Sequence, residues 1–188
     1  MLTLDNAHVY HWGDTIVPGV NEINRDAGLL TDAQWYTESG RQRGEYVHET
    51  LALYDEGQLE ETTLDARLAP YLMAWRNLLR MTGIQIEMIE QIMYHQELGY
   101  AGKPDRIITL RDQFGVLEIK TGVPKPSDQV QVAAYSLFGP YDYGWVAYLR
   151  KDGEPFLRSV MPLSEFRTVF LACLTIYRYK HNRHRRIS

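Results

Sequence analysis

Two carboxylates and a lysine flank a pair of β-like segments in the middle of the chain. Asp105 precedes the first segment, and Glu118 and Lys120 end the second. Side chains alternate between the two faces of a strand, so Glu118 and Lys120 point the same way. If the two segments pair as a hairpin, Asp105 can approach Glu118. Two carboxylates and an ammonium group on one face could hold a divalent cation beside a phosphate.

The chemistry that such a group could perform is hydrolysis of a phosphodiester. The attacking water must lose a proton, the charge that develops on the phosphate oxygens must be neutralised, and the leaving oxygen must be stabilised. Mg²⁺ or Mn²⁺ can do all three. Both ions accept oxygen ligands, so we expect Asp105 and Glu118 to bind one or two ions, aided by the backbone carbonyl of Ile119. Lys120 could orient the attacking water or steady the phosphate, and its pKa should fall beside a cation.

A helix expected over residues 31–57 could bring a further ligand. Thr31-Asp32 suits its N-cap, and Gly40, Gly44 and His48 are spaced by four residues, so they share one face. Glycine disfavours a helix, so two glycines there predict the close approach of another backbone. Taken alone, His48 is open to two interpretations: a hydrogen-bonded, half-buried helix residue, or a group that acts in the site.

The apolar spacing downstream predicts an amphipathic helix and then a three-stranded meander. The helix covers residues 59–82, and Pro70 should kink or divide it. The strands cover residues 84–95, 100–110 and 114–120, where the period changes to two. The helix forms a scaffold, whereas the last two strands carry the candidate chemistry.

The rest of the chain adds a helix over residues 127–139, a hairpin over 143–160 and a final helix from Ser164 into a basic tail at 178–188. This order predicts an α/β fold with a mixed central β-sheet, built from the meander and the C-terminal hairpin and flanked by α-helices. No linker or internal repeat divides the sequence, so we expect a single domain over residues 1–188.

Composition excludes several classes of site. The 188 residues carry a formal net charge of −4 and a single cysteine, Cys173, so an internal disulfide, a cysteine-held zinc and an iron–sulfur cluster are all excluded.

No apolar run has transmembrane length and no signal-peptide pattern is present, so we expect a cytoplasmic protein without a membrane partner. The tail residues Arg183, Arg185 and Arg186 either form a solvated terminus or contact a phosphate backbone.

Taken together, the motifs resemble those of the PD-(D/E)xK nuclease superfamily, in the RecB-like branch that includes phage-type exonucleases. The resemblance covers roughly residues 40–139 and follows the family's order. It rests on four segments: GEYVH at 44–48, GKPD at 102–105, EIKTG at 118–122 and QVAAY at 131–135. It implies a restriction-endonuclease-like core.

The resemblance also implies roles for individual residues. Asp105 and Glu118 match the metal-binding carboxylates, and Lys120 matches the catalytic lysine. His48 matches a helical histidine that ligates the metal, and its imidazole nitrogen would favour Mn²⁺ over Mg²⁺.

Three further positions match the family more loosely. Gln131 and Tyr135 correspond to a motif that supports the active site and contacts the DNA backbone. Glu90 corresponds to a position that is often acidic, and Glu87 is its alternative if a bulge shifts the strand.

The function implied is a metal-dependent deoxyribonuclease, an exonuclease acting in recombination, repair or phage DNA metabolism. Two alternatives stay open: a structure-specific endonuclease, and a non-catalytic module that binds DNA or a partner protein on the same fold. No helicase motif is present, so a helicase or recombination partner would be a separate protein, and a homo-oligomer is left open.

Overall fold

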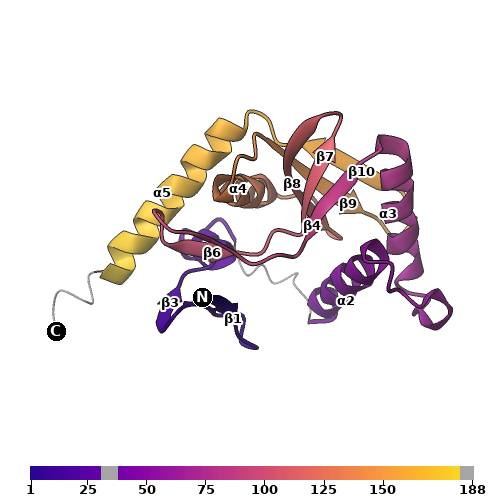
Figure 1. The fold of residues 1–188 in the computed structure, drawn as a ribbon, viewed down its shortest axis with the longest axis horizontal. Coiled ribbons are helices and arrows are strands. Elements are labelled where there is room, and N and C mark those ends of the chain that lie inside the picture. The colour runs from indigo at the N-terminus through magenta and orange to yellow at the C-terminus, as the bar shows by residue number, and fades with distance from the viewer. Residues whose placement is uncertain (31–37, 183–188) are drawn as a thin grey trace.

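A five-stranded mixed sheet forms the centre of the protein, seen in a computed structural model that describes residues 1–30 and 38–182 (Figure 1). Its strand order is β10-β9-β8-β7-β4, and only β8 and β9 run parallel. The strands are β4 (Gln85–Ile89), β7 (Arg106–Leu110), β8 (Gln113–Lys120), β9 (Tyr143–Leu149) and β10 (Pro155–Ser159). The expected α/β fold, with a meander joined to a C-terminal hairpin, is therefore confirmed.

Helices cover both faces of this sheet (Figure 1). One face carries α1 (Val20–Asp26), α4 (Pro126–Tyr135) and α5 (Leu163–Asn182), and the other carries α2 (Glu38–Asp55) and α3 (Ala69–Thr82). Side chains of β8 alternate between the two faces of the sheet and so contribute to a hydrophobic core on each. Val116 packs with the first group of helices, and Leu117 and Ile119 pack with the second. Glu118 and Lys120 share the face of Val116 and therefore point toward α4.

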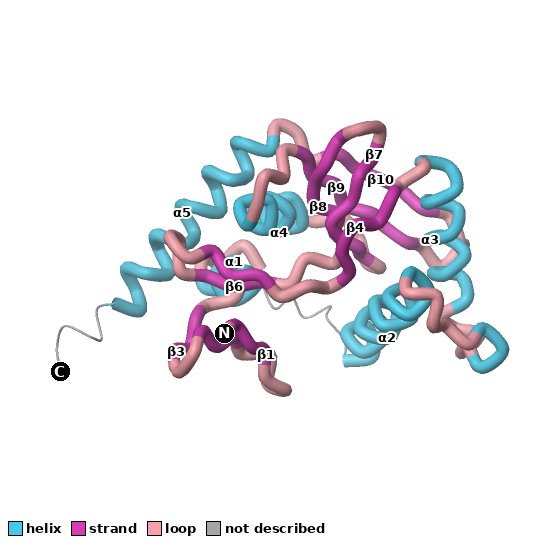
Figure 2. The backbone as a smooth tube through the Cα atoms, viewed as in Figure 1, coloured by secondary structure: helices cyan, strands magenta, loops and turns pink. Residues whose placement is uncertain are grey.

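Two small sheets lie beside the main one (Figure 2). The first joins β1 (Leu2–Leu4), β2 (Tyr10–Trp12) and β3 (Thr15–Val17), and the second joins β5 (Met93–His95) and β6 (Tyr100–Gly102). A bridge between Gly19 and Ala101 connects the two regions.

Two of the expected strands are each divided in the structure. The strand expected over residues 84–95 forms β4 and β5 in different sheets, because Glu90 adopts a left-handed backbone (φ 46°) that ends the pairing. The strand expected over 100–110 forms β6 and β7, separated by residues 103–105. Pro104 lies in this gap and has no N–H to donate to a ladder.

Pro70 begins a helix instead of kinking one. It lies in the first turn of α3, where its missing N–H would have no partner within the helix anyway. A short 3₁₀ turn, η1 (Glu61–Thr63), precedes α3, so the helix expected over 59–82 starts later than predicted. Gly83 closes α3 in a left-handed conformation (φ 69°).

The other helices keep their expected places with altered ends. The part of the 31–57 helix that is described ends at Asp55, while Thr31-Asp32 lies outside the described residues. Helix α4 stops at Tyr135 and continues as a 3₁₀ turn, η2 (Ser136–Phe138). None of the described helices is long and apolar enough to span a bilayer.

Candidate active site

The pairing of β7 with β8 places the two acidic residues opposite each other. Arg106 is aligned with Leu117, so Asp105, one residue before β7, faces Glu118. The Asp105 N–H donates to Glu118 Oε1 (3.2 Å), and the Ile119 N–H donates to Asp105 Oδ2 (2.7 Å). Both carboxylates are buried, and these bonds fix their orientation at the edge where the hairpin opens.

Helix α2 brings His48 to this pair. The imidazole Nδ1 lies 3.2 Å from Asp105 Oδ1. The donor atoms of His48, Glu90 and Asp105 all lie within 4.8 Å of one another, a set that suits a divalent metal. Among the described residues this closely spaced group does not include Glu118, which the resemblance also implies as a metal ligand.

Glu90, and not Glu87, is the acidic residue that reaches the cluster. Its carboxylate also pairs with Lys103, whereas Glu87 accepts a hydrogen bond from the Thr109 hydroxyl (2.9 Å). The break in the strand at Glu90 turns the side chain toward Asp105, and the Glu90 N–H donates to the Asp105 carbonyl (3.1 Å).

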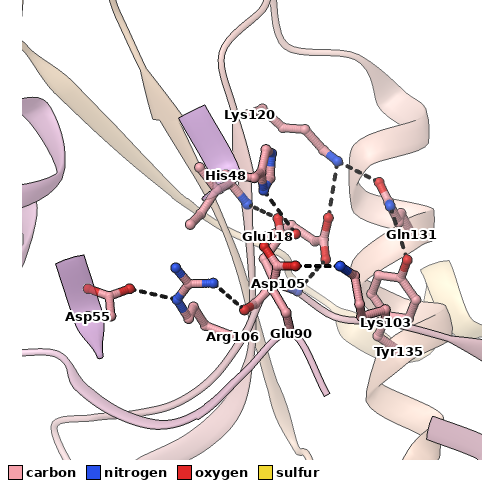
Figure 3. Close-up of polar contacts among 11 residues, drawn as sticks. His48, Asp55, Glu90, Lys103, Asp105, Arg106, Glu118, Lys120, Gln131 and Tyr135 are labelled. Atoms are coloured by element: carbon pink, nitrogen blue, oxygen red, sulfur yellow. Dashed lines mark hydrogen bonds and ion pairs between the residues drawn. The ribbon is translucent and has the colours of Figure 1, made fainter. Parts of the chain in front are cut away.

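A chain of hydrogen bonds leads from Glu118 to α4 (Figure 3). The Lys120 ammonium donates to Glu118 Oε2 (3.1 Å) and to Gln131 Oε1 (2.7 Å). The Gln131 amide in turn donates to the Tyr135 hydroxyl (3.3 Å). Gln131 and Tyr135 are four residues apart and therefore share the helix face that points at the site.

The glycine of the GKPD segment gives Tyr135 its space. A Cβ built on Gly102 would lie 2.5 Å from Cε1 of the Tyr135 ring, closer than any side chain tolerates. The close backbone approach predicted at Gly44 is not observed. A Cβ built there would lie 4.0 Å from the Thr121 hydroxyl, and no backbone atom of another described segment lies within that distance.

The two carboxyl groups titrate in opposite directions. Burial raises the pKa of Glu118 to about 8, and the nearby Asp105 charge adds to the rise while Lys120 opposes it. Burial also acts to raise the pKa of Asp105, but the charges of His48 and Lys120 outweigh it and hold that pKa well below its ordinary value. The pKa values of the two carboxyl groups are thus pushed apart by burial and by the charges beside each of them.

Neighbouring carboxylates raise the pKa values of the two basic groups of the site. Burial acts to lower the pKa of Lys120, but the charges of Glu118 and Asp105 raise it above its ordinary value. Burial likewise acts to lower the pKa of His48, and Asp105 reverses this into a net rise. The protein's own charges thus act on Lys120 opposite to the fall expected beside a metal ion.

A divalent cation fits this donor set. The buried carboxylates of Asp105 and Glu118 repel each other, and a cation would relieve that repulsion. Asp105 and Glu90 would supply oxygen ligands to it and His48 a nitrogen ligand. Glu118 lies next to this group through its bond to the Asp105 N–H. The backbone carbonyl of Ile119 stays a predicted ligand.

The basic end of α5 makes contacts within the protein. Arg178 donates to the Leu98 carbonyl (2.6 Å), and Lys180 and His181 both approach the Asp26 carboxylate. The tail arginines Arg183, Arg185 and Arg186 lie outside the described residues.

Sequence reasoning missed two groups beside the site. Lys103, inside the GKPD segment, pairs with Glu90, and Arg106, directly after Asp105, donates to the Asp105 carbonyl (2.6 Å). Their closeness to Asp105 in the sequence was the one available signal.

Among known proteins, the matches to this chain are solved structures. No family model matches the chain, and no curated protein matches its sequence. The chain is similar to the crystal structure of an alkaline exonuclease from Laribacter hongkongensis, with 19% identity, 87% of this chain and 92% of that chain covered, and a TM-score of 0.41. The same exonuclease in complex with dAMP gives 17% identity, coverage of 92% and 95%, and a TM-score of 0.41.

A protein from Eubacterium rectale that is provisionally named an exonuclease has a TM-score of 0.51, at 15% identity and with 86% of this chain and 73% of that chain covered. At this identity the likeness concerns the fold alone. The five-stranded mixed sheet flanked by helices, together with this likeness, confirms the predicted restriction-endonuclease-like fold.

Proposed function

We propose that the protein is a divalent-metal-dependent nuclease that hydrolyses DNA phosphodiester bonds. The observation that carries the proposal is one cluster in which His48, Glu90 and Asp105 offer metal donors beside the Glu118–Lys120 pair. The sequence motifs favour the RecB-like, phage-type exonuclease branch and a cytoplasmic role in recombination, repair or phage DNA metabolism.

In this proposal His48, Glu90, Asp105 and Glu118 hold one or two Mg²⁺ or Mn²⁺ ions. A bound ion supplies Lewis acidity at the phosphate and lowers the pKa of the attacking water. The protein's residues contribute charge and orientation. Glu118 must be deprotonated to bind a cation, and burial raises its pKa, so we expect metal binding and activity to increase as the pH rises toward 8.

Lys120 is the proposed catalytic cation. It is held between Glu118 and Gln131, which leaves a third N–H to meet a phosphate oxygen or the attacking water. Tyr135 supports Gln131 from the same helix, so the lysine is oriented before the substrate arrives.

The test is a cleavage assay on linear and closed circular DNA, single- and double-stranded, with Mg²⁺, Mn²⁺ or a chelator. We expect Asp105→Asn and Lys120→Met to lower the rate by at least about a hundredfold while the circular dichroism spectrum is unchanged. Lys151→Met, at an exposed lysine in the turn between β9 and β10, is the matched control and should retain full activity.

The outcomes of this assay distinguish an exonuclease, an endonuclease and a non-catalytic binding module. Cleavage of linear DNA alone identifies an exonuclease, whereas nicking of the closed circle identifies an endonuclease. Equal cleavage by the wild type, Asp105→Asn and Lys120→Met would contradict the proposal. DNA binding without cleavage, together with no Mn²⁺ binding by calorimetry, would identify a non-catalytic module.

A further inference from the structure

A buried ion pair joins the end of α2 to the start of β7. Asp55 is the last residue of α2 and Arg106 is the first of β7, and their side chains are 1% and 0% exposed. Arg106 Nε donates to Asp55 Oδ2 (2.7 Å), and the Trp75 indole N–H donates to Asp55 Oδ1 (2.7 Å). Both carboxylate oxygens are therefore held by donors on other elements.

The same guanidinium reaches the backbone of the candidate active site (Figure 3). Arg106 Nη1 donates to the main-chain carbonyl of Asp105 (2.6 Å), and that carbonyl also accepts the N–H of Glu90 (3.1 Å). Side chains alternate along β7, so Arg106 points toward α2 and α3 while Asp105 points into the site. Arg106 thus clamps the Asp105 backbone from behind.

Helix geometry links this clamp to His48. His48 and Asp55 are seven residues apart on α2, which is close to two full turns, so the two side chains lie on the same side of the helix. Fixing Asp55 on Arg106 therefore fixes the rotation of the helix that presents the His48 imidazole to Asp105. One network touches all three segments that contribute the donors His48, Glu90 and Asp105.

We propose that Asp55 and Arg106 are positioning residues that hold the His48, Glu90 and Asp105 donors in register for a metal; this rests on the proposed function above. A buried ion pair gives little net stability compared with apolar side chains of similar size. The presence of this pair under the site is better explained by geometry than by stability. Residues that orient metal ligands typically change metal affinity about ten- to a hundredfold when they are replaced.

Two variants test the proposal. Arg106→Lys keeps a positive charge beside Asp55 but lacks the planar fork that reaches both Asp55 and the Asp105 carbonyl. Asp55→Asn keeps the shape and can still accept from Trp75. For both, calorimetric titration should give a Mn²⁺ Kd raised about ten- to a hundredfold. Cleavage should recover at saturating Mn²⁺, because neither residue touches the reacting atoms.

Leu174→Ala is the control for a general loss of stability. Leu174 is buried in the core cluster around α4 and α5, away from α2, so its truncation should lower Tm without changing the Mn²⁺ Kd. If Arg106→Lys and Asp55→Asn likewise lower Tm and leave the Kd unchanged, the ion pair is structural only and the proposal is wrong.

A readout without metal separates this proposal from the proposed function. In metal-free crystal structures of the variants, His48 Nδ1 should lie beyond hydrogen-bonding distance of Asp105 Oδ1, compared with 3.2 Å here; an unchanged separation would overturn the positioning role even if the wild type binds no Mn²⁺. Should a single variant fail to fold, the double variant Asp55→Leu/Arg106→Met replaces the pair with apolar side chains of similar size, and the same two measurements decide.

Discussion

Replacement of Glu118 by glutamine should remove a large part of the pH dependence of folding in the metal-free protein. Glu118 is 1% exposed, and burial beside Asp105 raises its pKa from 4.5 to about 8. Between those two values the folded protein holds a proton that the unfolded chain has lost. The stabilising proton is therefore fully present below pH 4.5 and is lost as the pH rises through 8.

The magnitude follows from proton linkage. A difference of one bound proton changes the free energy of unfolding by about 1.4 kcal/mol per pH unit. Between pH 5 and 8, Glu118 should therefore cost the wild type up to about 4 kcal/mol, a substantial part of the 5–15 kcal/mol typical of a domain. The raised pKa of His48 contributes a loss of the same sign above pH 6.5, and it does so in both proteins.

The assay is urea denaturation of wild type and Glu118→Gln in the presence of a chelator, at intervals from pH 5 to 8.5. We expect the two curves of unfolding free energy against pH to diverge, with the variant becoming more stable relative to the wild type as the pH rises. Adding Mn²⁺ at about a hundred times its Kd should restore about 2.7 kcal/mol to the wild type.

Parallel curves for the two proteins would refute the reasoning, because they would mean that Glu118 has the same proton affinity in the folded and unfolded chains. A divergence of the opposite sign would contradict the reasoning as well, because the buried carboxyl pair would then not bind more protons than the unfolded chain.

Three further predictions follow from the site and its surroundings. His48→Ala should weaken Mn²⁺ binding more than Mg²⁺ binding, and identical metal titration curves for the variant and the wild type would argue against ligation. Gly102→Ala should cost about 1–3 kcal/mol in urea denaturation because the new Cβ meets the Tyr135 ring, whereas Gly122→Ala, where no neighbour lies within 4 Å, serves as the unstrained control. Deleting residues 182–188 should weaken DNA binding and flatten its salt dependence, and an unchanged slope would favour a solvated terminus.

Local sequence patterns are sufficient to predict the β7–β8 hairpin and the chemistry of the residues on it. The period of two over residues 114–120 places Glu118 and Lys120 on one face whatever the rest of the chain does, because alternation is a property of the extended backbone. Helical spacing does the same for Gln131 and Tyr135 on α4. These local patterns therefore predict the fold class without any tertiary contact.

Local patterns failed where distant segments compete for the backbone. Residues 84–95 alternate well enough for one strand, yet the chain turns at Glu90, whose N–H bonds the Asp105 carbonyl and whose carboxylate meets Lys103. The apolar spacing predicts a break at Pro70, but Pro70 lies in the first turn of α3, where a proline is tolerated. For Glu90 the deciding partners lie outside any local window.

The sequence by itself determined which residue types could hold a metal and which of them share a face, because these follow from side-chain chemistry and backbone periodicity. Only the tertiary structure decided which of them meet: His48 approaches Asp105, Glu90 joins them while its alternative Glu87 does not, and Arg106 pairs with Asp55. These contacts join residues far apart in the chain, and packing α2 against the sheet brings them together. No local pattern of charge or hydrophobicity records that packing.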